Sequence, residues 1–213
     1  MDVSIVIPIY NSASLIRDSV EQLARALGSL PVRYEILLRD DGSSDRSRDV
    51  LEKLPAQFAS VKVFFNEKNR GLGFTLRRLF ADAQGARVIY MDCDLPFGAD
   101  AVREVLERLE KHDIVVCSRY LGKKNTVSWP RKAASRAYYY LCKALLNIPV
   151  KDIGSGTVGF RKEALNRLDL VSDGFAIHAE MFARAVRCHS SIIEIGVEAL
   201  GEEKGNNYIF RYG

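Results

Sequence analysis

The sequence predicts an α/β fold in which a mostly parallel β-sheet is flanked by helices. Short apolar runs alternate with amphipathic segments along the first half of the chain, which is the order expected of a parallel sheet with crossover helices. The first run, Val3 to Ile9, is apolar on both faces, as expected for a strand covered on both sides. A chain of 213 residues suits one such domain and is too short for a second catalytic domain, so we treat residues 1–213 as a single domain.

Each strand is predicted from a run of β-branched and other apolar residues that ends in polar or glycine-containing sequence. The alternation is interrupted after about residue 119, and a glycine-rich turn is expected at residues 154–156. In chain order, strands are expected over Val3 to Ile9, Tyr34 to Leu38, Val61 to Phe65, Val88 to Met91, Ile114 to Cys117 and Ile192 to Val197.

The helices are predicted from apolar residues at helical spacing. Ser12 or Ser14 can cap the first helix and Gly28 can end it. The apolar residues of this first helix are Ile16, Val20, Leu23 and Leu27. Further helices are expected around Val50 to Leu54, from the end of the loop at residues 66–73 through Phe80, over Ala101 to Lys111 and around His178 to Val186.

Composition and charge narrow the classes of function. The 31 Lys and Arg side chains exceed the 27 Asp and Glu side chains by a net charge of +4, which is too small for the one-sided basic face of a nucleic-acid-binding protein. This mild basicity fits an anionic small substrate or a lipid surface. The four cysteines form no CxxC pair, so we expect reduced thiols rather than disulfides or a zinc site.

Three polar clusters follow the predicted strands at the edge where open α/β sheets bind ligands. They are Tyr10-Asn11, Asp40-Asp41-Gly42-Ser43 and Asp92-Cys93-Asp94. In an extended chain the side chains of Asp92 and Asp94 point to the same side, and their oxygens form a hard site for a divalent cation with room for phosphate. The pattern therefore predicts Mg2+ or Mn2+ bound to a diphosphate.

Two other interpretations of Asp92 and Asp94 compete with this one. The two carboxylates can simply cap a solvated turn. Phosphatases of the haloacid-dehalogenase type also place two Asp residues after an apolar strand and use the first as a nucleophile. Their motif generally lies near the N-terminus and continues to Thr or Val, whereas here it follows the fourth strand and continues to Pro96.

In combination, four motifs make the chain resemble the inverting glycosyltransferases of family 2, which have the GT-A fold. The resemblance implies that residues up to about 118 bind a nucleotide sugar and that residues from about 119 onward bind the acceptor. The four motifs occur in the order and at the spacing of that family, and they are Val6-Ile7-Pro8-Ile9-Tyr10-Asn11, Asp40-Asp41-Gly42-Ser43-Ser44-Asp45, Asn69-Arg70-Gly71-Leu72-Gly73 and Met91-Asp92-Cys93-Asp94-Leu95.

The resemblance also implies roles for individual residues. Asp92 and Asp94 would hold the sugar diphosphate and its Mg2+ or Mn2+ ion, and Asp94 would take part directly in catalysis. The residues implied to contact the nucleotide sugar are Pro8, Tyr10, Asn11, Asp40, Asp41, Gly71, Asp92, Cys93, Asp94 and Lys204.

Motifs in the second half resemble those of polyprenyl-phosphate sugar synthases, such as dolichyl-phosphate mannose synthases. This resemblance implies that Arg119, Arg131 and Ser135 hold the phosphate of a polyprenyl phosphate acceptor. Guanidinium groups suit phosphate oxygens, and a hydroxyl one helical turn away can reach the same anion. GDP-mannose is the favoured donor, and UDP-glucose is also compatible with the motifs. The motifs are Ser118-Arg119-Tyr120, Trp129-Pro130-Arg131 with Ser135, and Asp152-Ile153-Gly154-Ser155-Gly156.

The acceptor decides whether a general base is needed. A sugar hydroxyl must lose a proton as it attacks, whereas a lipid phosphate is already an anionic nucleophile. Glu180 corresponds to a family Glu and is the candidate base if the acceptor is the hydroxyl of a saccharide or glycolipid. Alternatively, Glu180 and His178 order the acceptor loop or cap a helix.

The sequence departs from the family pattern after residue 200. Where the family has an Arg before a Gly-x-Ser-Lys run, this chain has Glu202-Glu203-Lys204-Gly205. The family Arg faces the leaving diphosphate. Either Lys204 or Arg211 therefore takes its place, or the protein binds a nucleotide sugar without turnover.

The sequence also predicts where the protein acts. The first residues lack the features of a signal peptide, and no apolar run reaches the ~18 residues that span a bilayer. We expect a cytoplasmic protein that contacts the inner face of a membrane through the basic and aromatic segment at residues 129–146. The alternative is an ordinary helix that packs its Tyr and Leu side chains on the sheet and leaves Arg and Lys in solvent.

Overall fold

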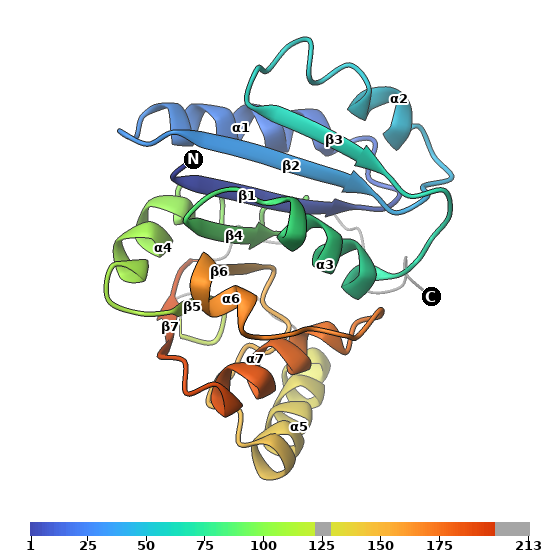
Figure 1. The fold of residues 1–213 in the computed structure, drawn as a ribbon. Coiled ribbons are helices and arrows are strands. Elements are labelled where there is room, and N and C mark those ends of the chain that lie inside the picture. The colour runs from blue at the N-terminus through green and yellow to red at the C-terminus, as the bar shows by residue number, and fades with distance from the viewer. Residues whose placement is uncertain (122–128, 199–213) are drawn as a thin grey trace.

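A seven-stranded β-sheet forms the centre of the computed structural model (Figure 1). The structure describes residues 1–121 and 129–198; residues 122–128 and 199–213, and the side chains of residues 129–137, lie outside this description. The strands are β1 (Val3–Ile9), β2 (Tyr34–Asp40), β3 (Val61–Phe65), β4 (Arg87–Met91), β5 (Ile114–Ser118), β6 (Thr157–Arg161) and β7 (Ile192–Gly196). Their order in the sheet is β3-β2-β1-β4-β6-β5-β7, which confirms the predicted α/β fold.

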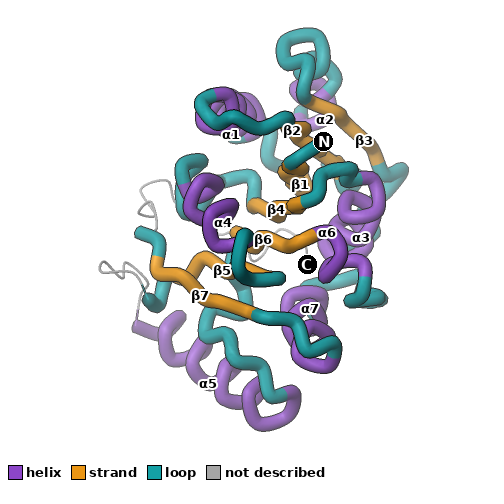
Figure 2. Tube along the Cα trace, turned by 60° about the vertical axis from the view of Figure 1, so that its left-hand side comes forward, coloured by secondary structure: helices purple, strands orange, loops and turns teal. Residues whose placement is uncertain are grey.

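The helices form a layer on each face of this sheet (Figure 2). One apolar core contains Val20 of α1 and Val105 of α4, and the other contains Leu76 of α3 and Met181 of α7. In β1, successive side chains enter opposite cores, as the period of a strand requires. The helices are α1 (Ile16–Gly28), α2 (Ser47–Leu51), α3 (Leu72–Asp82), α4 (Ala101–Leu109), α5 (Trp129–Leu146), α6 (Lys162–Asn166) and α7 (Ile177–Arg187).

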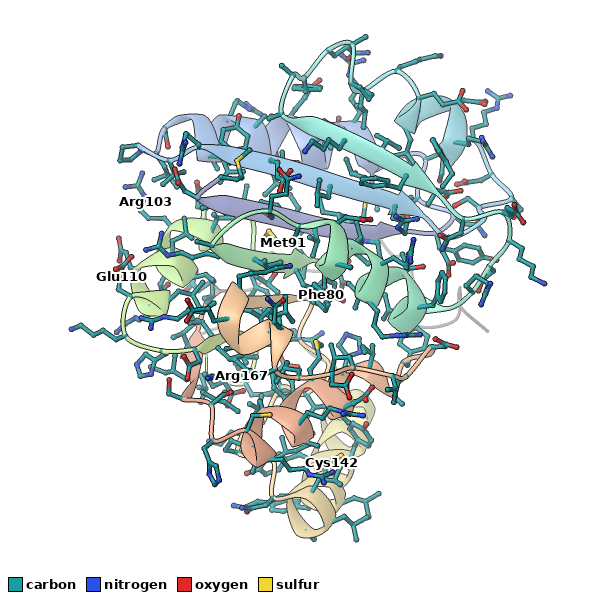
Figure 3. The ribbon with its side chains drawn as sticks, viewed as in Figure 1. Phe80, Met91, Arg103, Glu110, Cys142 and Arg167 are labelled. Carbon is teal, nitrogen blue, oxygen red and sulfur yellow. The ribbon has the colours of Figure 1, made fainter. Side chains whose placement is uncertain are left out.

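The interior of the sheet is closely packed (Figure 3). Met91, at the end of β4, is fully buried, and Phe80 of α3 meets Phe160 of β6 edge to face at a ring-centroid distance of 5.7 Å. Charged side chains such as Arg103 and Glu110, in and directly after α4, are exposed at the end of the sheet away from the carboxyl end of β4 (Figure 3). In the part of the chain that the structure describes, no helix has the length and apolar character needed to cross a membrane.

Strand β6 differs from the prediction, because the sequence predicts only a glycine-rich turn in this region. The strand runs antiparallel to both of its neighbours, β4 and β5, so the sheet is mixed. It is short and contains Gly159, whose lack of a side chain allows close contact with α4: a Cβ there would lie 3.2 Å from Cδ1 of Leu109. Packing between two existing strands, rather than its own apolar pattern, therefore makes this segment a strand.

The beginning of α1 also differs from the prediction. Neither Ser12 nor Ser14 caps the helix with its side chain, and the residue at the N-cap position is Leu15. The Ser12 hydroxyl instead donates to the carbonyl of Tyr10 at 2.9 Å, while the main-chain carbonyl of Ser12 accepts the N–H of Leu15 at the same distance. The end of the helix at Gly28 is as predicted.

Candidate active site

β1 and β4 lie side by side in the sheet (Figure 1), but their pairing ends before the carboxyl end of either strand. Their ladder ends where Val6 pairs with Tyr90. Beyond that point β4 pairs only with β6, and the N–H of Asp92 donates to the carbonyl of Gly156 at 2.8 Å. β2 and β3 lie on one side of β1 and β4 lies on the other, and open α/β sheets bind ligands at such a switch point. Pro8 lies past the last β1–β4 pair, so its missing N–H removes no bond to β4.

The Asp92-Cys93-Asp94 segment forms a tight turn directly after β4. The N–H of Leu95 donates to the carbonyl of Asp92 at 3.0 Å, and Leu95 has a φ of 45°, which is uncommon for a residue other than glycine. Cys93 is buried in the core, and burial raises the pKa of its thiol to about 12. Asp92 is half-buried and Asp94 is exposed, so the two carboxylates are accessible to a ligand and the thiol between them is not.

The carboxylate of Asp92 is surrounded by groups from three segments. The hydroxyl of Tyr90 donates to Oδ1 of Asp92 and lies 3.3 Å from Nε2 of His178 in α7. A Cβ at Gly156 would lie 2.9 Å from Cγ of Asp92, so the approach requires glycine. Burial raises the pKa of Asp92, although the Tyr90 bond and the charge of Arg119 act in the other direction. A carboxylate that has lost part of its hydration in this way favours the binding of a cation.

Burial also determines the charge of His178. It lowers the pKa of the imidazole to about 4, so the ring is neutral near pH 7. Phe175 stacks against His178 with a ring-centroid distance of 6.4 Å, and the Tyr90 ring lies 5.9 Å from it on tilted planes. His178 therefore joins α7 to the aspartate turn as a neutral group.

The loop after β2 is bound to the end of β1. Asn11, with a φ of 48°, accepts at Oδ1 from the N–H of Ser44 at 2.8 Å and from the N–H of Asp45 at 3.3 Å. The hydroxyl of Ser43 accepts from the N–H of Asn11 at 2.9 Å, and Asp40 accepts from the N–H of Ser43 at 3.2 Å. The structure thus brings two of the predicted clusters together beyond the end of the β1–β4 ladder.

Asp41 is fully buried and organises the loop that precedes α3. Its carboxylate accepts the side-chain amide of Asn66 at 2.8 Å and the main-chain N–H groups of Arg70 and Gly71 at 2.9 Å each. These contacts hold the segment between β3 and α3 against the end of β2. They support a positioning role for Asp41 rather than the direct contact with the nucleotide that the sequence predicts.

The beginning of α3 rests on the loop at residues 172–174. Gly71 has a φ of 92°, and a Cβ there would lie 2.5 Å from the carbonyl oxygen of Asp173. The same carbonyl accepts the N–H of Phe74 at 3.0 Å. A glycine is required at this position by both its backbone conformation and the close approach of the loop.

Glu180 of α7 holds that loop in place. Its two carboxylate oxygens accept the N–H groups of Val171 at 3.0 Å and Ser172 at 2.8 Å, and Arg184 donates to Oε1 at 2.8 Å. Burial by itself raises the pKa of Glu180, but these hydrogen bonds outweigh it and lower the pKa below its usual value. The contacts favour the interpretation in which Glu180 orders the acceptor loop over the one in which it is a base.

Arg119 follows β5 and is clamped by Asp152. Its Nε and Nη2 donate to the two carboxylate oxygens at 3.0 and 2.8 Å, and its main-chain N–H donates to Oδ2 at 3.0 Å. Asp152 is itself held by its N–H bond to Glu194 at 2.9 Å. Burial by itself lowers the pKa of Arg119, but the hydrogen bonds and charge of Asp152 outweigh this effect and raise the pKa above its usual value. The guanidinium therefore stays charged. Its third nitrogen, Nη1, makes no hydrogen bond to any described residue.

Three of the predicted site residues cannot be placed at the level of side chains. Arg131 and Ser135 both belong to α5, and their side chains are among those outside the described residues. Lys204 lies entirely outside the described part of the chain. Pro8, Tyr10, Asn11, Asp40, Gly71, Asp92 and Asp94 all lie at or beside the carboxyl ends of β1, β2 and β4 or the start of α3.

The donor set at this edge fits one kind of metal site. Among the described residues, no group of three or more His, Cys, Asp or Glu side chains is arranged to hold an ion. Asp92 and Asp94 supply carboxylate oxygens only, which suits Mg2+ or Mn2+ when phosphate oxygens and water complete the shell. These residues therefore fit a metal–diphosphate site and do not fit a metal enclosed by protein ligands.

Comparison with known proteins agrees with this geometry. Residues 4–169 match the sequence profile described as "Glycosyl transferase family 2". The chain belongs to glycosyl transferase family 2. The family resemblance carried by the four sequence motifs is therefore confirmed, and the protein is a glycosyltransferase by family.

Relatives of this glycosyltransferase include enzymes named for lipid-linked sugars. A dolichol-phosphate mannosyltransferase of Pyrococcus furiosus is 31% identical over 222 aligned positions, which cover 100% of this chain and 62% of the relative. The glycosyltransferase AglD of Haloferax volcanii is 29% identical over 98% of this chain and 34% of its own length. An undecaprenyl-phosphate 4-deoxy-4-formamido-L-arabinose transferase of Edwardsiella ictaluri is 29% identical over 99% of this chain and 63% of its own. The chain thus spans less than two thirds of each of these relatives.

Solved structures show the same fold. A mannosyltransferase of Pyrobaculum calidifontis in complex with GDP-Man and Mn2+ has a TM-score of 0.68 at 17% identity, covering 97% of this chain and 58% of that one. Glucosyl-3-phosphoglycerate synthase of Mycobacterium tuberculosis in complex with UDP has a TM-score of 0.74 at 17% identity, covering 98% of this chain and 74% of that one. These similarities confirm the GT-A fold of this glycosyltransferase.

Several residues of the site could not be found by sequence reasoning. Tyr90 looks like an ordinary apolar position in a strand, yet its hydroxyl reaches the Asp92 carboxylate. Asp152 belongs to one of the motifs that resemble polyprenyl-phosphate sugar synthases, but the motif does not indicate its bidentate bond to Arg119. The one available signal for Tyr90 is its position two residues before Asp92, because side chains two residues apart in an extended chain point to the same side.

Asp41 and Asp40 provide a matched test of positioning against binding. We expect Asp41→Asn to lower the free energy of unfolding by about 2–3 kcal/mol, because the new amide group would face buried N–H donors. Asp40→Asn should lower it by less than about 1 kcal/mol, since Asp40 accepts only longer bonds from Ser43. Chemical denaturation of both variants measures this difference, and equal stabilities would contradict the role given to Asp41.

Proposed function

We propose that this glycosyltransferase moves a hexose from a nucleotide diphosphate sugar to a polyprenyl phosphate, with inversion at the anomeric carbon. The family and the fold support sugar transfer. The name of one relative supports mannose as the sugar, and the names of two support a polyprenyl phosphate as the acceptor. We take GDP-mannose as the donor, since GDP-Man is the ligand of one solved structure with this fold. We further propose that the reaction requires Mg2+ or Mn2+.

One observation carries the proposal: a cationic group suited to phosphate stands close to a pair of carboxylates suited to a metal–diphosphate. Arg119 is near enough to Asp92 for its charge to influence the pKa of that carboxylate. Asp152 fixes the plane of the guanidinium through two hydrogen bonds. The guanidinium therefore keeps its orientation, and its Nη1 can donate to an incoming anion.

In the proposed reaction a phosphate oxygen of the acceptor attacks the anomeric carbon, and the bond from that carbon to the donor diphosphate breaks on the opposite side. The nucleophile is already an anion, so no proton has to leave it. Asp92 and Asp94 would hold the metal ion, which when bound would neutralise charge on the departing diphosphate. Arg119 would orient the acceptor and reduce its repulsion from the diphosphate.

The absence of a proton-transfer step agrees with the contacts of Glu180. Both of its oxygens already accept main-chain N–H groups, and Arg184 pairs with it. A role as general base for a hydroxyl acceptor would require at least one of these bonds to be replaced. Transfer to a saccharide hydroxyl from a UDP-sugar is therefore the less favoured function, and binding without turnover is a third outcome that an assay can detect.

We also propose that one face of α5 contacts the inner surface of a membrane, where a polyprenyl phosphate would be found. Tyr140, Leu141 and Leu145 are 64, 55 and 72% exposed, although each has a large apolar surface. Lys143 lies over the ring of Tyr139 at 5.8 Å, which keeps its cation beside this face. Aromatic rings and cations on one exposed helix suit the headgroup layer of anionic lipid.

The first test addresses the donor site. We expect Asp94→Asn to lower transfer of mannose from GDP-mannose to a short polyprenyl phosphate by roughly 100-fold or more, because a ligand of the metal–diphosphate is lost. The stabilisation of the fold by GDP with Mn2+ in a thermal-shift assay should disappear as well. Asp18→Asn, on the exposed side of α1, is the matched control and should behave like the original chain. Full activity in Asp94→Asn would refute the proposed donor site.

A second test distinguishes the acceptors. Arg131→Ala should reduce transfer to polyprenyl phosphate by roughly 100-fold, because a charge-assisted contact to phosphate is removed, and should leave GDP binding unchanged. Arg187→Ala, at the exposed end of α7, provides the control. Retention of transfer to the lipid in Arg131→Ala, or transfer from a UDP-sugar to a saccharide instead, would favour the hydroxyl acceptor. A chain that binds donor and transfers to neither would be a binding protein.

A third test concerns the membrane. Replacing Leu141 or Leu145 by Asp should weaken binding to vesicles of anionic phospholipid by about tenfold, since partial burial of a leucine contributes about 1.5 kcal/mol. Val171→Asp is the control, because Val171 is 60% exposed but lies on a different element. Vesicle co-sedimentation at several lipid concentrations measures the change. Equal binding by all three variants would show that α5 is not the contact.

A further inference from the structure

Tyr90 and His178 form a buried connection to Asp92 that the proposed reaction does not use directly. The Tyr90 side chain is fully buried in β4, and its hydroxyl is the group that reaches the surface turn. That hydroxyl donates to Oδ1 of Asp92 and lies within 3.3 Å of Nε2 of His178. A phenyl ring alone would fill the same space in the core, so packing does not explain the hydroxyl.

The other sides of the Asp92 carboxylate are fixed as well. The main-chain N–H of Asp92 is bonded to Gly156, and the close approach of Gly156 to the carboxylate leaves no room for a side chain there. The carboxylate is thus held by a hydroxyl on one side and by backbone on another. Its orientation is set before any ligand binds, which is the condition for a group that must meet a metal ion in a defined geometry.

His178 is fixed in turn by its own surroundings. Its ring lies between Phe175 and Tyr90 and comes from α7, the helix that also carries Glu180. Glu180 holds the loop at residues 171–173, against which α3 begins. Residues two positions apart on α7 therefore contact Tyr90, which is bonded to Asp92, and the loop that supports the start of α3.

We propose that Tyr90 and His178 are positioning residues that set the Asp92 carboxylate for a divalent cation bound with the donor diphosphate. This inference rests on the proposed function, because it takes Asp92 to be a ligand of the metal–diphosphate. Hydrogen-bonding partners behind a metal ligand fix its orientation, and their loss commonly weakens metal binding 10–100-fold. Neither residue contacts the substrate in this scheme.

Direct measurement of metal binding tests the inference. Mn2+ is titrated into the purified chain in the presence of GDP, and free Mn2+ is followed by electron paramagnetic resonance. Tyr90→Phe keeps the ring and removes only the hydroxyl, and it should weaken Mn2+ binding roughly tenfold or more. Binding of GDP without metal should change less than about twofold. The matched control is Tyr34→Phe, whose hydroxyl, among the residues that the structure describes, makes only a long contact of 3.4 Å to the carbonyl of Ala24.

Two substitutions at His178 separate positioning from packing. His178→Phe keeps a ring between Phe175 and Tyr90 but removes the nitrogen, and it should weaken Mn2+ binding as Tyr90→Phe does. His178→Gln supplies a polar group that can bond to the Tyr90 hydroxyl, and it should recover most of the affinity. The two His178 variants test the inference even if Tyr90→Phe does not fold.

Asp92→Asn is the reference that separates this inference from the proposed function. Loss of Mn2+ binding in Asp92→Asn, with Tyr90→Phe and His178→Phe at the level of the original chain, would overturn the inference and leave the metal site standing. Unchanged Mn2+ binding in both Asp92→Asn and Asp94→Asn would overturn the proposed metal site itself. Equal losses of Mn2+ binding and of metal-free GDP binding in Tyr90→Phe would show a general structural role and would also overturn the inference.

Discussion

The exchange of strand partners at the end of β4 positions the whole site. β4 stops pairing with β1 after Tyr90 and continues to pair with β6 through Met91. Because β6 runs antiparallel, the loop that leads into it arrives at the same edge of the sheet as the end of β4. Asp152 of that loop and Asp92 of the turn are thereby brought to one place. A parallel strand in the same position would deliver its preceding loop to the opposite edge.

The charges at this edge suit the two anionic substrates of the proposed reaction, which repel each other. Transfer to a phosphate requires a donor diphosphate and an acceptor phosphate to approach closely, which is unfavourable without cations between them. The protein offers Asp92 and Asp94 for a divalent cation on one side and the guanidinium of Arg119 on the other. Asp152 keeps Arg119 oriented and charged, and the desolvation of Asp92 favours a cation over an empty carboxylate site. In the proposed reaction each cationic element would serve a different phosphate.

The parts of the fold that the sequence predicts are those encoded locally. The early strands follow from apolar runs, and the turn at Asp92 to Asp94 follows from polar residues after a strand. The bond between Arg119 and Asp152 joins residues 33 positions apart, and the contact of Tyr90 with His178 joins residues 88 positions apart. No local pattern carries such pairs. β6 is not predicted for the same reason, since its place between two other strands, and not its own sequence, makes it part of the sheet.

The same long-range contacts bear on the choice of acceptor. Glu180 is bonded to the N–H groups of Val171 and Ser172, and the loop they belong to supports Gly71, whose N–H is bonded to Asp41. Releasing Glu180 to act as a base would free two main-chain donors and loosen a support of the nucleotide side of the site. A phosphate acceptor avoids this cost, because it needs no base. The structural use of Glu180 and the chemistry of an anionic nucleophile are therefore consistent with each other, which is why the lipid phosphate is the acceptor that the geometry favours.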